Sequence, residues 1–310
     1  GNVAAGSEFF GFWMDLTIDN ALATMNAFSD NTVHSTFHMG IKSWPVGWRP
    51  SEPQVLVNTK VYRNRVRGLF IQFSSNVTFD GGLVADTRHA VDIRLSDFIT
   101  FKNFNILGNT DEYMDIVNTR SGQPSHCGVA TTGVRPHVNT FTEGSDGTTL
   151  ENVAFSGYAR PECSSTAVAI DMDSHYWKNT FTAPTTFSNV AFDTTDSIDA
   201  FSLCNIASKG VKDIAILDVD GSFDPAGGTG PGTIVSDDAS MTEGKSCVVM
   251  TGSCAQYCQG NSALTAGAVA VSAPAPAPDG TAPAPADPSP TPALTAGPMP
   301  VPTPTDTFTV

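Results

Sequence analysis

Basic residues are scarce in this chain. Its 310 residues include 16 Lys and Arg against 31 Asp and Glu, which gives a formal net charge of −15. Such an acidic surface repels nucleic acid and anionic lipid, because both carry negative charge. It repels acidic polysaccharide as well, except where basic residues gather locally. We therefore predict no nucleic-acid partner.

Long apolar runs are also missing. The longest run towards the end, residues 263–273, is rich in Ala and Gly, and it falls well short of the roughly 20 apolar residues that a membrane-spanning helix needs. We predict no membrane span in this piece. The sequence contains no phosphate loop, dinucleotide motif or recognisable Ser-His-Asp arrangement, so it indicates no cofactor.

Metal-binding motifs are incomplete. Cys254 and Cys258 resemble half of a zinc site, but no second close pair or nearby His completes it. Asp218 and Asp220 begin like a calcium loop, but Thr229 stands where an EF-hand needs Glu. We predict no metal site, and a β-turn after Asp218.

Short alternating apolar segments are what the chain does contain, most densely over residues 55–107. Each is followed by Gly, Asn or Asp, and no window keeps apolar residues at helical spacing for long. Such period-two runs, broken by turn residues, predict short strands. The segments are Leu69, Ile71 and Phe73; Val77 and Phe79; Val91, Ile93 and Leu95; and Ile99 and Phe101.

The strands repeat as the phrase Asn-Val-x-Phe, which begins at Asn76, Asn152 and Asn189, with looser copies from Asp97 and Asp213. A period of about 20–50 residues in short strands is typical of a solenoid. We predict an all-β parallel β-helix of the pectin-lyase type, with Asn in left-handed bends and Asn side chains bonded from coil to coil. A β-sandwich with coincidental repetition is the alternative.

The composition divides the chain into three parts. Residues 1–243 form the predicted β-helix, with residues 108–149 as a long excursion from it, and residues 244–262 form a cysteine-rich cap over its exposed end. Twelve of the 21 prolines fall in the last 47 residues, among Ala, Thr and Ser. Residues 263–310 therefore predict a disordered, extended stalk or linker.

Six cysteines indicate disulfides and an oxidising, extracellular or cell-surface location. They are Cys127, Cys163, Cys204, Cys247, Cys254 and Cys258, and the sequence leaves their pairing open. Asn76-Val77-Thr78 is a glycosylation acceptor. It coincides with the repeat phrase, so Asn76 is equally explained as a structural residue.

Two groups of residues are candidates for a site. Asp171 and Asp173 share one face of a predicted strand about 6.5–7 Å apart, which suits an inverting glycosidase. Asn109-Thr110-Asp111 faintly resembles a polygalacturonase motif, but the other signatures of that family are missing. The strand pattern puts Arg63, Arg65 and Arg67 on one face as a basic binding patch. A structural role is the simpler explanation for each group.

Several phrases together resemble a known family. VAAGSEFFGFW (3–13), DNTVHS (30–35), GTTLENVAFSGY (147–158) and DVDGSF with GPGTIVSDD (218–238) are similar to the extracellular region of fibrocystin and fibrocystin-like proteins. The cell-migration-inducing, hyaluronan-binding protein and its transmembrane relative share this region. The resemblance covers most of residues 1–258. It implies a right-handed parallel β-helix, of which this chain is the C-terminal part, in a large secreted or cell-surface parent.

The resemblance implies roles in surface coats, receptors or hyaluronan handling, and it transfers no catalytic residue. His34, within the second phrase, is a candidate binding residue, although a structural His is the simpler interpretation. We predict a non-catalytic extracellular module that binds a glycan (hyaluronan-like) or other extracellular proteins. The alternative is a polysaccharide-degrading enzyme, hyaluronidase-like or pectinase-like.

Overall fold

The computed structural model describes the following residues: 1–14, 16, 21–25, 27–44, 46–110, 132–136, 139–140, 145–158, 168–172, 181–192, 201–202, 215–224, 230–236, 246–249 and 255–259. Their regular structure consists of strands, and none of these residues lies in a helix. Contacts divide the chain into residues 1–268 and 269–310, and every described residue belongs to the first unit. The described fold is therefore all-β, and no helix in it is long and apolar enough to cross a membrane.

The larger sheet has 13 strands. Eight of them follow one another in chain order and pair in parallel. The eight are β1 (Val3–Ala5), β4 (Thr32–His34), β6 (Gln54–Tyr62), β8 (Ser75–Ala85), β10 (Asp97–Leu107), β13 (Thr148–Ser156), β16 (Thr185–Ser188) and β19 (Ala215–Asp218). Two short strands pair in parallel with members of this series: β3 (Phe28–Ser29) with β6, and β17 (Ala191–Phe192) with β13.

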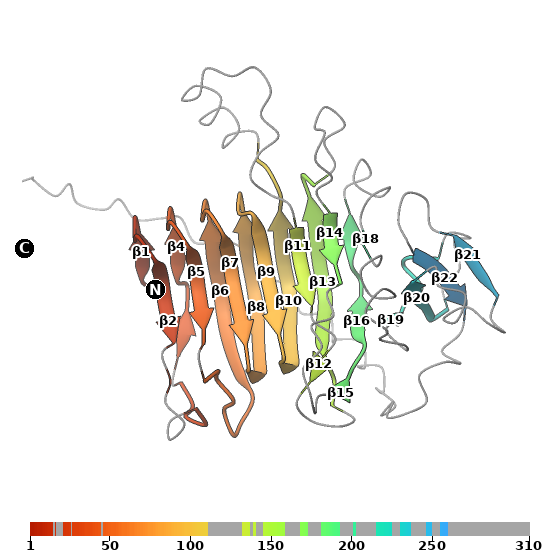
Figure 1. The fold of residues 1–310 in the computed structure, drawn as a ribbon, viewed down its shortest axis with the longest axis horizontal. Coiled ribbons are helices and arrows are strands. Elements are labelled where there is room, and N and C mark those ends of the chain that lie inside the picture. The colour runs from red at the N-terminus through yellow and green to blue at the C-terminus, as the bar shows by residue number, and fades with distance from the viewer. Residues whose placement is uncertain are drawn as a thin grey trace, which may run out of the picture. The chain divides into compact units, whose positions relative to one another are not determined.

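The second sheet has seven strands, all paired in parallel. In chain order they are β2 (Phe10–Met14), β5 (Met39–Ser43), β7 (Arg67–Gln72), β9 (His89–Arg94), β11 (Thr132–Pro136), β14 (Val168–Asp171) and β18 (Phe201–Ser202). The chain passes back and forth between the two sheets, and Figure 1 shows the strands side by side in chain order. A separate antiparallel pair joins β12 (Asn139–Thr140) to β15 (Phe181–Thr182).

The core consists of apolar side chains from both sheets, packed as one cluster. Residues equivalent from strand to strand lie on one another: Val77 pairs with Ile99, and the rings of Phe79 and Phe101 stack 4.9 Å apart. Full burial of one such side chain stabilises the fold by about 1.5–3 kcal/mol. The predicted alternation over residues 69–101 is confirmed, since the segments' apolar residues are buried except the half-buried Phe73.

Asparagines bend the long strands of the larger sheet, as predicted. Asn58, Asn103, Asn152 and Asn189 all have positive φ, between 49° and 54°, and Asn tolerates this left-handed backbone better than most residues. Their side chains also bond between strands. Asn152 Nδ2 donates to Asn103 Oδ1 (2.7 Å), and Asn189 Nδ2 donates to Asn152 Oδ1 (3.0 Å). This asparagine ladder fixes the bend at the same place in successive strands.

One copy of the repeat phrase, which begins at Asn76, lies at a different position along its strand from the other two. Asn152 and Asn189 occupy equivalent positions, and the rings of Phe155 and Phe192 stack 5.1 Å apart. Asn76 begins a copy that lies on the other half of the long strand, because Phe79 aligns through Phe101 with Leu150 rather than with Phe155. Grouping all three copies as one repeat position was therefore wrong. Asn76 does occupy a left-handed bend (φ 58°), and its amide donates to the Pro50 carbonyl.

The predicted excursion over residues 108–149 contains a strand of the seven-stranded sheet. Residues 132–136 form β11, which lies between β9 and β14 in the seven-stranded sheet, with Val134 fully buried. The sequence prediction missed this strand because Gly133 and Pro136 flank its one large apolar residue. Residues 111–131 lie outside the described residues.

Parallel pairing ends at β19. Beyond it, β20 (Gly232–Ser236), β22 (Ala255–Gln259) and β21 (Cys247–Val249) pair antiparallel. A disulfide joins Cys247 to Cys258 across β21 and β22. This confirms a disulfide for two of the six cysteines; Cys127, Cys163, Cys204 and Cys254 lie outside the described residues, as does the predicted stalk.

Candidate binding face of the seven-stranded sheet

One row of side chains crosses the outer face of the seven-stranded sheet. Ile41, Leu69, Val91, Val134 and Ile170 pack into the core, so the residue after each of them points away from it. These outward residues are aligned by the parallel register. With strands about 4.8 Å apart, the five steps span about 24 Å. The row consists of Trp13, Lys42, Phe70, Asp92, Arg135 and Asp171.

Asp92 is the centre of the row's first charged group. Its carboxylate is fully buried and accepts from Arg67 Nε at 2.6 Å and from Arg94 Nε and Nη2 at 3.0 Å. Both guanidinium groups also lie over the Phe70 ring, 4.9 and 5.4 Å from its centroid. Two cations thus cover one carboxylate and one aromatic ring, and they remain partly exposed to solvent.

Arg135 and Asp171 form a second charged group on the next strands. Arg135 Nε donates to Asp171 Oδ2 at 3.0 Å, and Arg135 Nη2 donates to the same oxygen. A guanidinium bound through two nitrogens is held in a fixed orientation. The Asp171 carboxylate is therefore engaged in an ion pair with Arg135.

Lys42 forms the third group, together with three aromatic rings. Its ammonium lies 4.1 Å from the ring centroid of Phe10, 4.7 Å from that of Trp13 and 4.5 Å from that of Trp44. Trp13 Nε1 donates to the Trp44 carbonyl at 2.8 Å, which ties the two tryptophans together. Each cation–ring contact contributes about 0.5–2 kcal/mol, depending on how far it is shielded from water. We call Lys42, Phe10, Trp13 and Trp44 the aromatic cage.

Two histidines near this face have lowered pKa values, His38 and His89. Burial, together with Arg135 and other cations and against the opposing effect of Asp92, lowers the pKa of His89 from 6.5 to about 4. Burial, Arg67 and Lys42 also lower the pKa of His38. Both imidazoles are therefore neutral at pH 7. Three guanidinium groups on this face are thus bound to carboxylates: Arg67 and Arg94 to Asp92, and Arg135 to Asp171.

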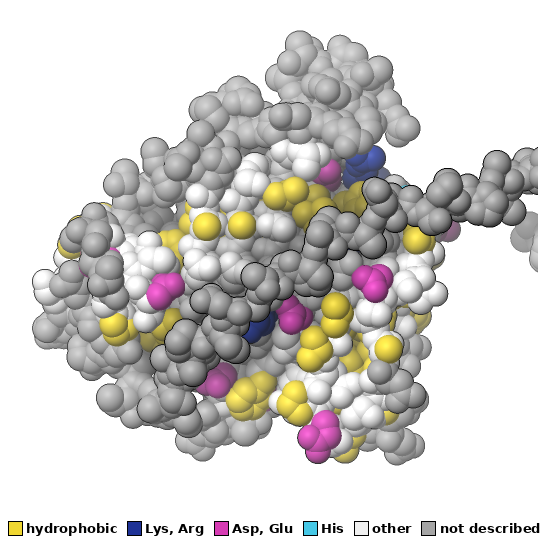
Figure 2. Space-filling model, turned by 180° about the vertical axis from the view of Figure 1, so that it is seen from behind, with side chains coloured by type: hydrophobic (Ala, Val, Ile, Leu, Met, Phe, Trp, Pro, Cys, Tyr) yellow, Lys and Arg dark blue, Asp and Glu magenta, His cyan; other side chains and the backbone are white. Residues whose placement is uncertain are grey.

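These three arginines stand out in so acidic a chain. On the face drawn in Figure 2, the Asp and Glu side chains of the described residues are scattered and form no cluster. On the larger sheet, Lys102 and Glu151 neutralise each other at 2.8 Å. Among the described residues, the outer face of the seven-stranded sheet therefore gathers three arginines with aromatic rings beside them.

The structure separates the predicted site residues. Asp171 joins the row, whereas Asp173 and Asp111 lie outside the described residues. The prediction that Arg63, Arg65 and Arg67 share one face of a strand is wrong. Residues 63–66 connect β6 to β7, and Arg63 has a left-handed φ of 56°. Only Arg67 lies beside the row, where it binds Asp92.

His34 and Arg65 make local contacts elsewhere. The His34 imidazole stacks on the Tyr62 ring of the neighbouring strand, with 5.0 Å between centroids and 8° between planes. Arg65 lies over the exposed ring of Phe37, 4.7 Å from its centroid. His34 thus has the contacts of a residue that packs one strand on the next.

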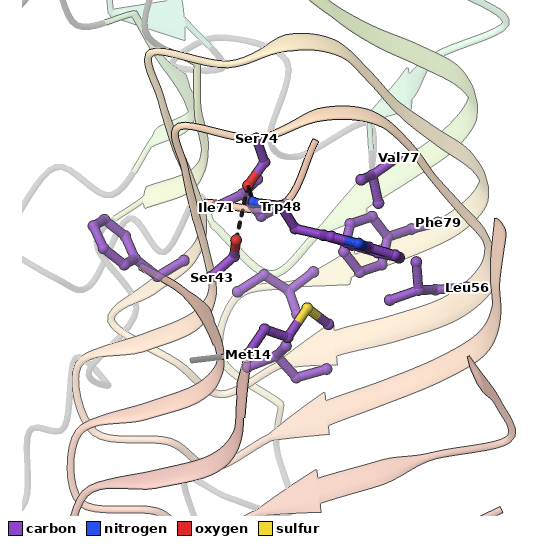
Figure 3. A pocket seen from close by; sticks show the side chains of 11 residues that line it. Met14, Ser43, Trp48, Leu56, Ile71, Ser74, Val77 and Phe79 are labelled. Atoms are coloured by element: carbon purple, nitrogen blue, oxygen red, sulfur yellow. Dashed lines mark hydrogen bonds between the residues drawn. The ribbon is translucent and has the colours of Figure 1, made fainter. Parts of the chain in front are cut away.

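An apolar pocket lies inside the fold, between the two sheets (Figure 3). Its polar side chains satisfy one another: the Ser43 and Ser74 hydroxyls are 2.8 Å apart, and Ser74 Oγ also accepts from the Trp48 amide. The remaining lining is mostly aliphatic and aromatic, including Met14, Leu56 and Phe79. No described charged group lines the pocket, so it offers a polar ligand little to bind.

The sequence reasoning missed Lys42, Phe70, Asp92, Arg94 and Arg135. Each follows a buried Ile, Leu or Val in a short alternating segment, as in Val91-Asp92-Ile93-Arg94. The strand register brings Lys42, Asp92 and Arg135 into one column, and Arg94 lies two residues beyond Asp92. Searches with known proteins found no matching family model and no matching curated protein.

Proposed function

We propose that this chain is a right-handed parallel β-helix that binds an acidic polysaccharide without cleaving it. The alternation between two parallel sheets and the asparagine ladder support the β-helix. Paired residues are 28 apart between β4 and β6 (Thr32 and Lys60) and 22 apart between β8 and β10 (Val77 and Ile99), which fits one turn of such a solenoid. The right hand follows the general rule for parallel crossovers.

The observation that carries the binding proposal is the group of three partly exposed arginines, Arg67, Arg94 and Arg135, on one face of an otherwise acidic protein. An extended polyanion needs cations repeated along a line, and these arginines lie on the three neighbouring strands β7, β9 and β11, which together span about 10 Å. Arginine suits carboxylate and sulfate groups, because its planar donors bind two oxygens at once. The exposed rings of Trp13 and Trp44 add apolar surface for sugar rings.

The state of two described carboxylates, Asp92 and Asp171, supports the proposed non-catalytic role. A general acid or base has to exchange a proton with its ligand. Asp92 is fully buried between two guanidinium groups, and Asp171 is bound by Arg135. The same residues are well suited to holding the arginines in place. We propose an extracellular or cell-surface location, in keeping with the Cys247–Cys258 disulfide, and membership of the fibrocystin-like family.

The test measures binding and cleavage together. The full chain is titrated with hyaluronan, polygalacturonate and neutral dextran, and the length of each polymer is followed over time. We expect the two acidic polymers to bind, dextran not to bind, and no polymer to shorten. Shortening that Asp171→Asn abolishes would establish the enzyme alternative, and failure of the folded protein to bind either acidic polymer would refute the proposal.

A matched pair of variants locates the site. Arg94→Gln removes one of the three arginines but leaves Arg67 on Asp92, and Lys102→Gln removes one cation from the larger sheet. A charged hydrogen bond contributes about 1.5–3 kcal/mol, so we expect Arg94→Gln to weaken binding about tenfold or more. Lys102→Gln should change binding less than twofold. Equal effects would show that the ligand responds to overall charge and not to this row.

A further inference from the structure

We infer that Asp218 and Asp220 share one proton in acid, and that this carboxyl pair then holds the antiparallel strands β20, β21 and β22 more firmly to the end of β19 than at neutral pH. Asp218 is the last residue of β19, where parallel pairing stops, and it pairs with Gly232 of β20. Asp220 lies two residues beyond β19. The carboxyl pair thus occupies the junction between the parallel and antiparallel parts of the larger sheet, and it does not depend on the proposed ligand.

The Asp218 carboxyl group joins β19 to β22 and to the turn that follows β19. Its Oδ2 accepts from the Tyr257 hydroxyl at 3.1 Å and from the Phe223 amide at 3.0 Å, and its Oδ1 accepts from the Ser222 amide at 3.2 Å. Gly232 leaves room for the hydroxyl, because a side chain there would collide with the Tyr257 ring. Asp218 is fully buried, so this carboxyl group fixes β22 to the end of β19.

The Asp220 carboxyl group lies directly beside that of Asp218. The Ser222 amide donates to both groups, at 3.1 Å to Asp220 Oδ1 and at 3.2 Å to Asp218 Oδ1, and the two carboxyl groups are within hydrogen-bonding reach of each other. Asp220 Oδ2 also accepts from the Asn189 amide, at the end of the asparagine ladder. The carboxyl pair therefore links the ladder to the antiparallel strands.

The surroundings of the carboxyl pair favour a single shared proton. Buried Asp92 is bound by two guanidinium groups, whereas hydroxyls and amides donate to Asp218. Two adjacent carboxylates repel each other, so one of them takes up a proton and donates it to the other. Burial and the neighbouring Asp220 raise the pKa of Asp218. Against the opposing effect of burial, hydrogen bonds from Asn189, Asp218 and Ser222 lower the pKa of Asp220.

The other described ionisable groups around the carboxyl pair are Tyr257 and Asp224. Burial and the charge of Asp218 raise the pKa of Tyr257, so its hydroxyl keeps the proton that it donates. Asp224, in the turn after β19, adds negative charge that acts in the same direction on Tyr257. Among the described residues, the adjoining strands β16, β17 and β20 add no ionisable side chain. The described neighbours therefore leave the proton exchange to Asp218 and Asp220.

Proton linkage gives the sign of the effect. Between 3.8, the ordinary pKa of Asp, and the raised pKa of Asp218, the closed junction keeps a proton that the opened junction has released. The junction therefore gains stability as pH falls from neutral through the raised pKa of Asp218. It loses stability again as pH falls below 3.8 towards the lowered pKa of Asp220. At neutral pH, repulsion between two carboxylates weakens the attachment of β22.

The experiment follows hydrogen exchange of the full chain at pH 7 and pH 4.5, with each rate corrected for the intrinsic effect of pH. Each pH unit over which only the closed junction holds the proton changes the local opening equilibrium by up to about tenfold. We expect β20 and β22 to open at least about threefold less at pH 4.5 than at pH 7, and β8 to show no such gain. Asp220→Asn replaces the shared proton with a permanent amide donor, so at pH 7 it should protect β20 and β22 about as well as acid protects them in the wild-type chain.

Asp80→Asn is the matched control, because Asp80 accepts from Asn103 in β8, which lies four strands from β19 in the sheet. It should leave the pH response of β20 and β22 unchanged. Carboxyl NMR shifts of the wild-type chain give a second readout, since a shared proton makes Asp218 and Asp220 respond in the same pH step. Unrelated titrations of the two groups, or protection of β20 and β22 that stays equal or falls between pH 7 and pH 4.5, would overturn the inference.

Discussion

The two sheets contribute to one core but differ on their outer faces. The larger sheet carries exposed Val55 and Val57 and the solvent-exposed pair of Lys102 and Glu151. Exposed pairs of this kind contribute little to stability, about 0–1 kcal/mol. The seven-stranded sheet instead buries Asp92 under two arginines and covers Lys42 with rings. Because burying charge is costly, the comparison suggests that the larger sheet serves the fold and the smaller one serves a ligand.

The largest effect should come from breaking the shared core. Phe101 is fully buried between Phe79 and Phe104, so Phe101→Ala should lower the free energy of unfolding by about 3–5 kcal/mol. Thr100→Ala, on the outer face of the same strand, should change it by less than about 0.5 kcal/mol. Urea denaturation measures both. Similar losses for the two variants would mean that β10 does not present alternate residues to core and solvent.

Breaking the asparagine ladder should have the next largest effect. Asn152→Ala removes the bonds to Asn103 and Asn189 and forces Ala into a left-handed backbone, so we expect a loss of about 2–3 kcal/mol. Asn152→Gly removes the same bonds but tolerates the positive φ. Its loss should be about 1 kcal/mol smaller in the same denaturation assay. Equal losses would show that the backbone bend contributes nothing.

The antiparallel strands β20, β22 and β21 should become less stable when the Tyr257 hydroxyl is removed. Tyr257 Oη donates to Asp218 Oδ2 at 3.1 Å, and both residues are buried. Tyr257→Phe keeps the ring but leaves that carboxylate with one donor fewer, which should cost about 1–2 kcal/mol. Hydrogen exchange should accelerate in β20 and β22 and stay unchanged in β8. Faster exchange in β8 as well would indicate that the two regions unfold together.

The smallest effect concerns pH and the smaller sheet alone. The pKa of His89 is about 4 in the folded chain and about 6.5 when unfolded, so the unfolded chain takes up a proton first as pH falls. Stability attributable to His89 is therefore complete above pH 6.5 and is lost as pH falls towards 4. His89→Gln should flatten the change in the denaturation midpoint between pH 7 and pH 5. An unchanged slope would exclude His89 as its source.

The sequence predicted more of the fold than of the candidate site. Local alternation predicted the strands around Leu69, Val91 and Ile99, and the conformational tolerance of Asn predicted the bends, because both properties belong to short segments. The row could not be found that way, since Asp92 and Arg135 become neighbours only through the register of strands far apart in the chain. The same register separates Asn76 from Asn152, although their phrases read alike.

The most direct test of the central claim is a hydrogen-exchange footprint of the full chain with and without hyaluronan. The two sheets serve as each other's control in one sample. Slower exchange over β5, β7, β9 and β11, with unchanged exchange over β6, β8 and β10, is the predicted result. Protection of β6, β8 and β10 instead, or no protection at saturating ligand, would contradict the assignment of binding to the seven-stranded sheet.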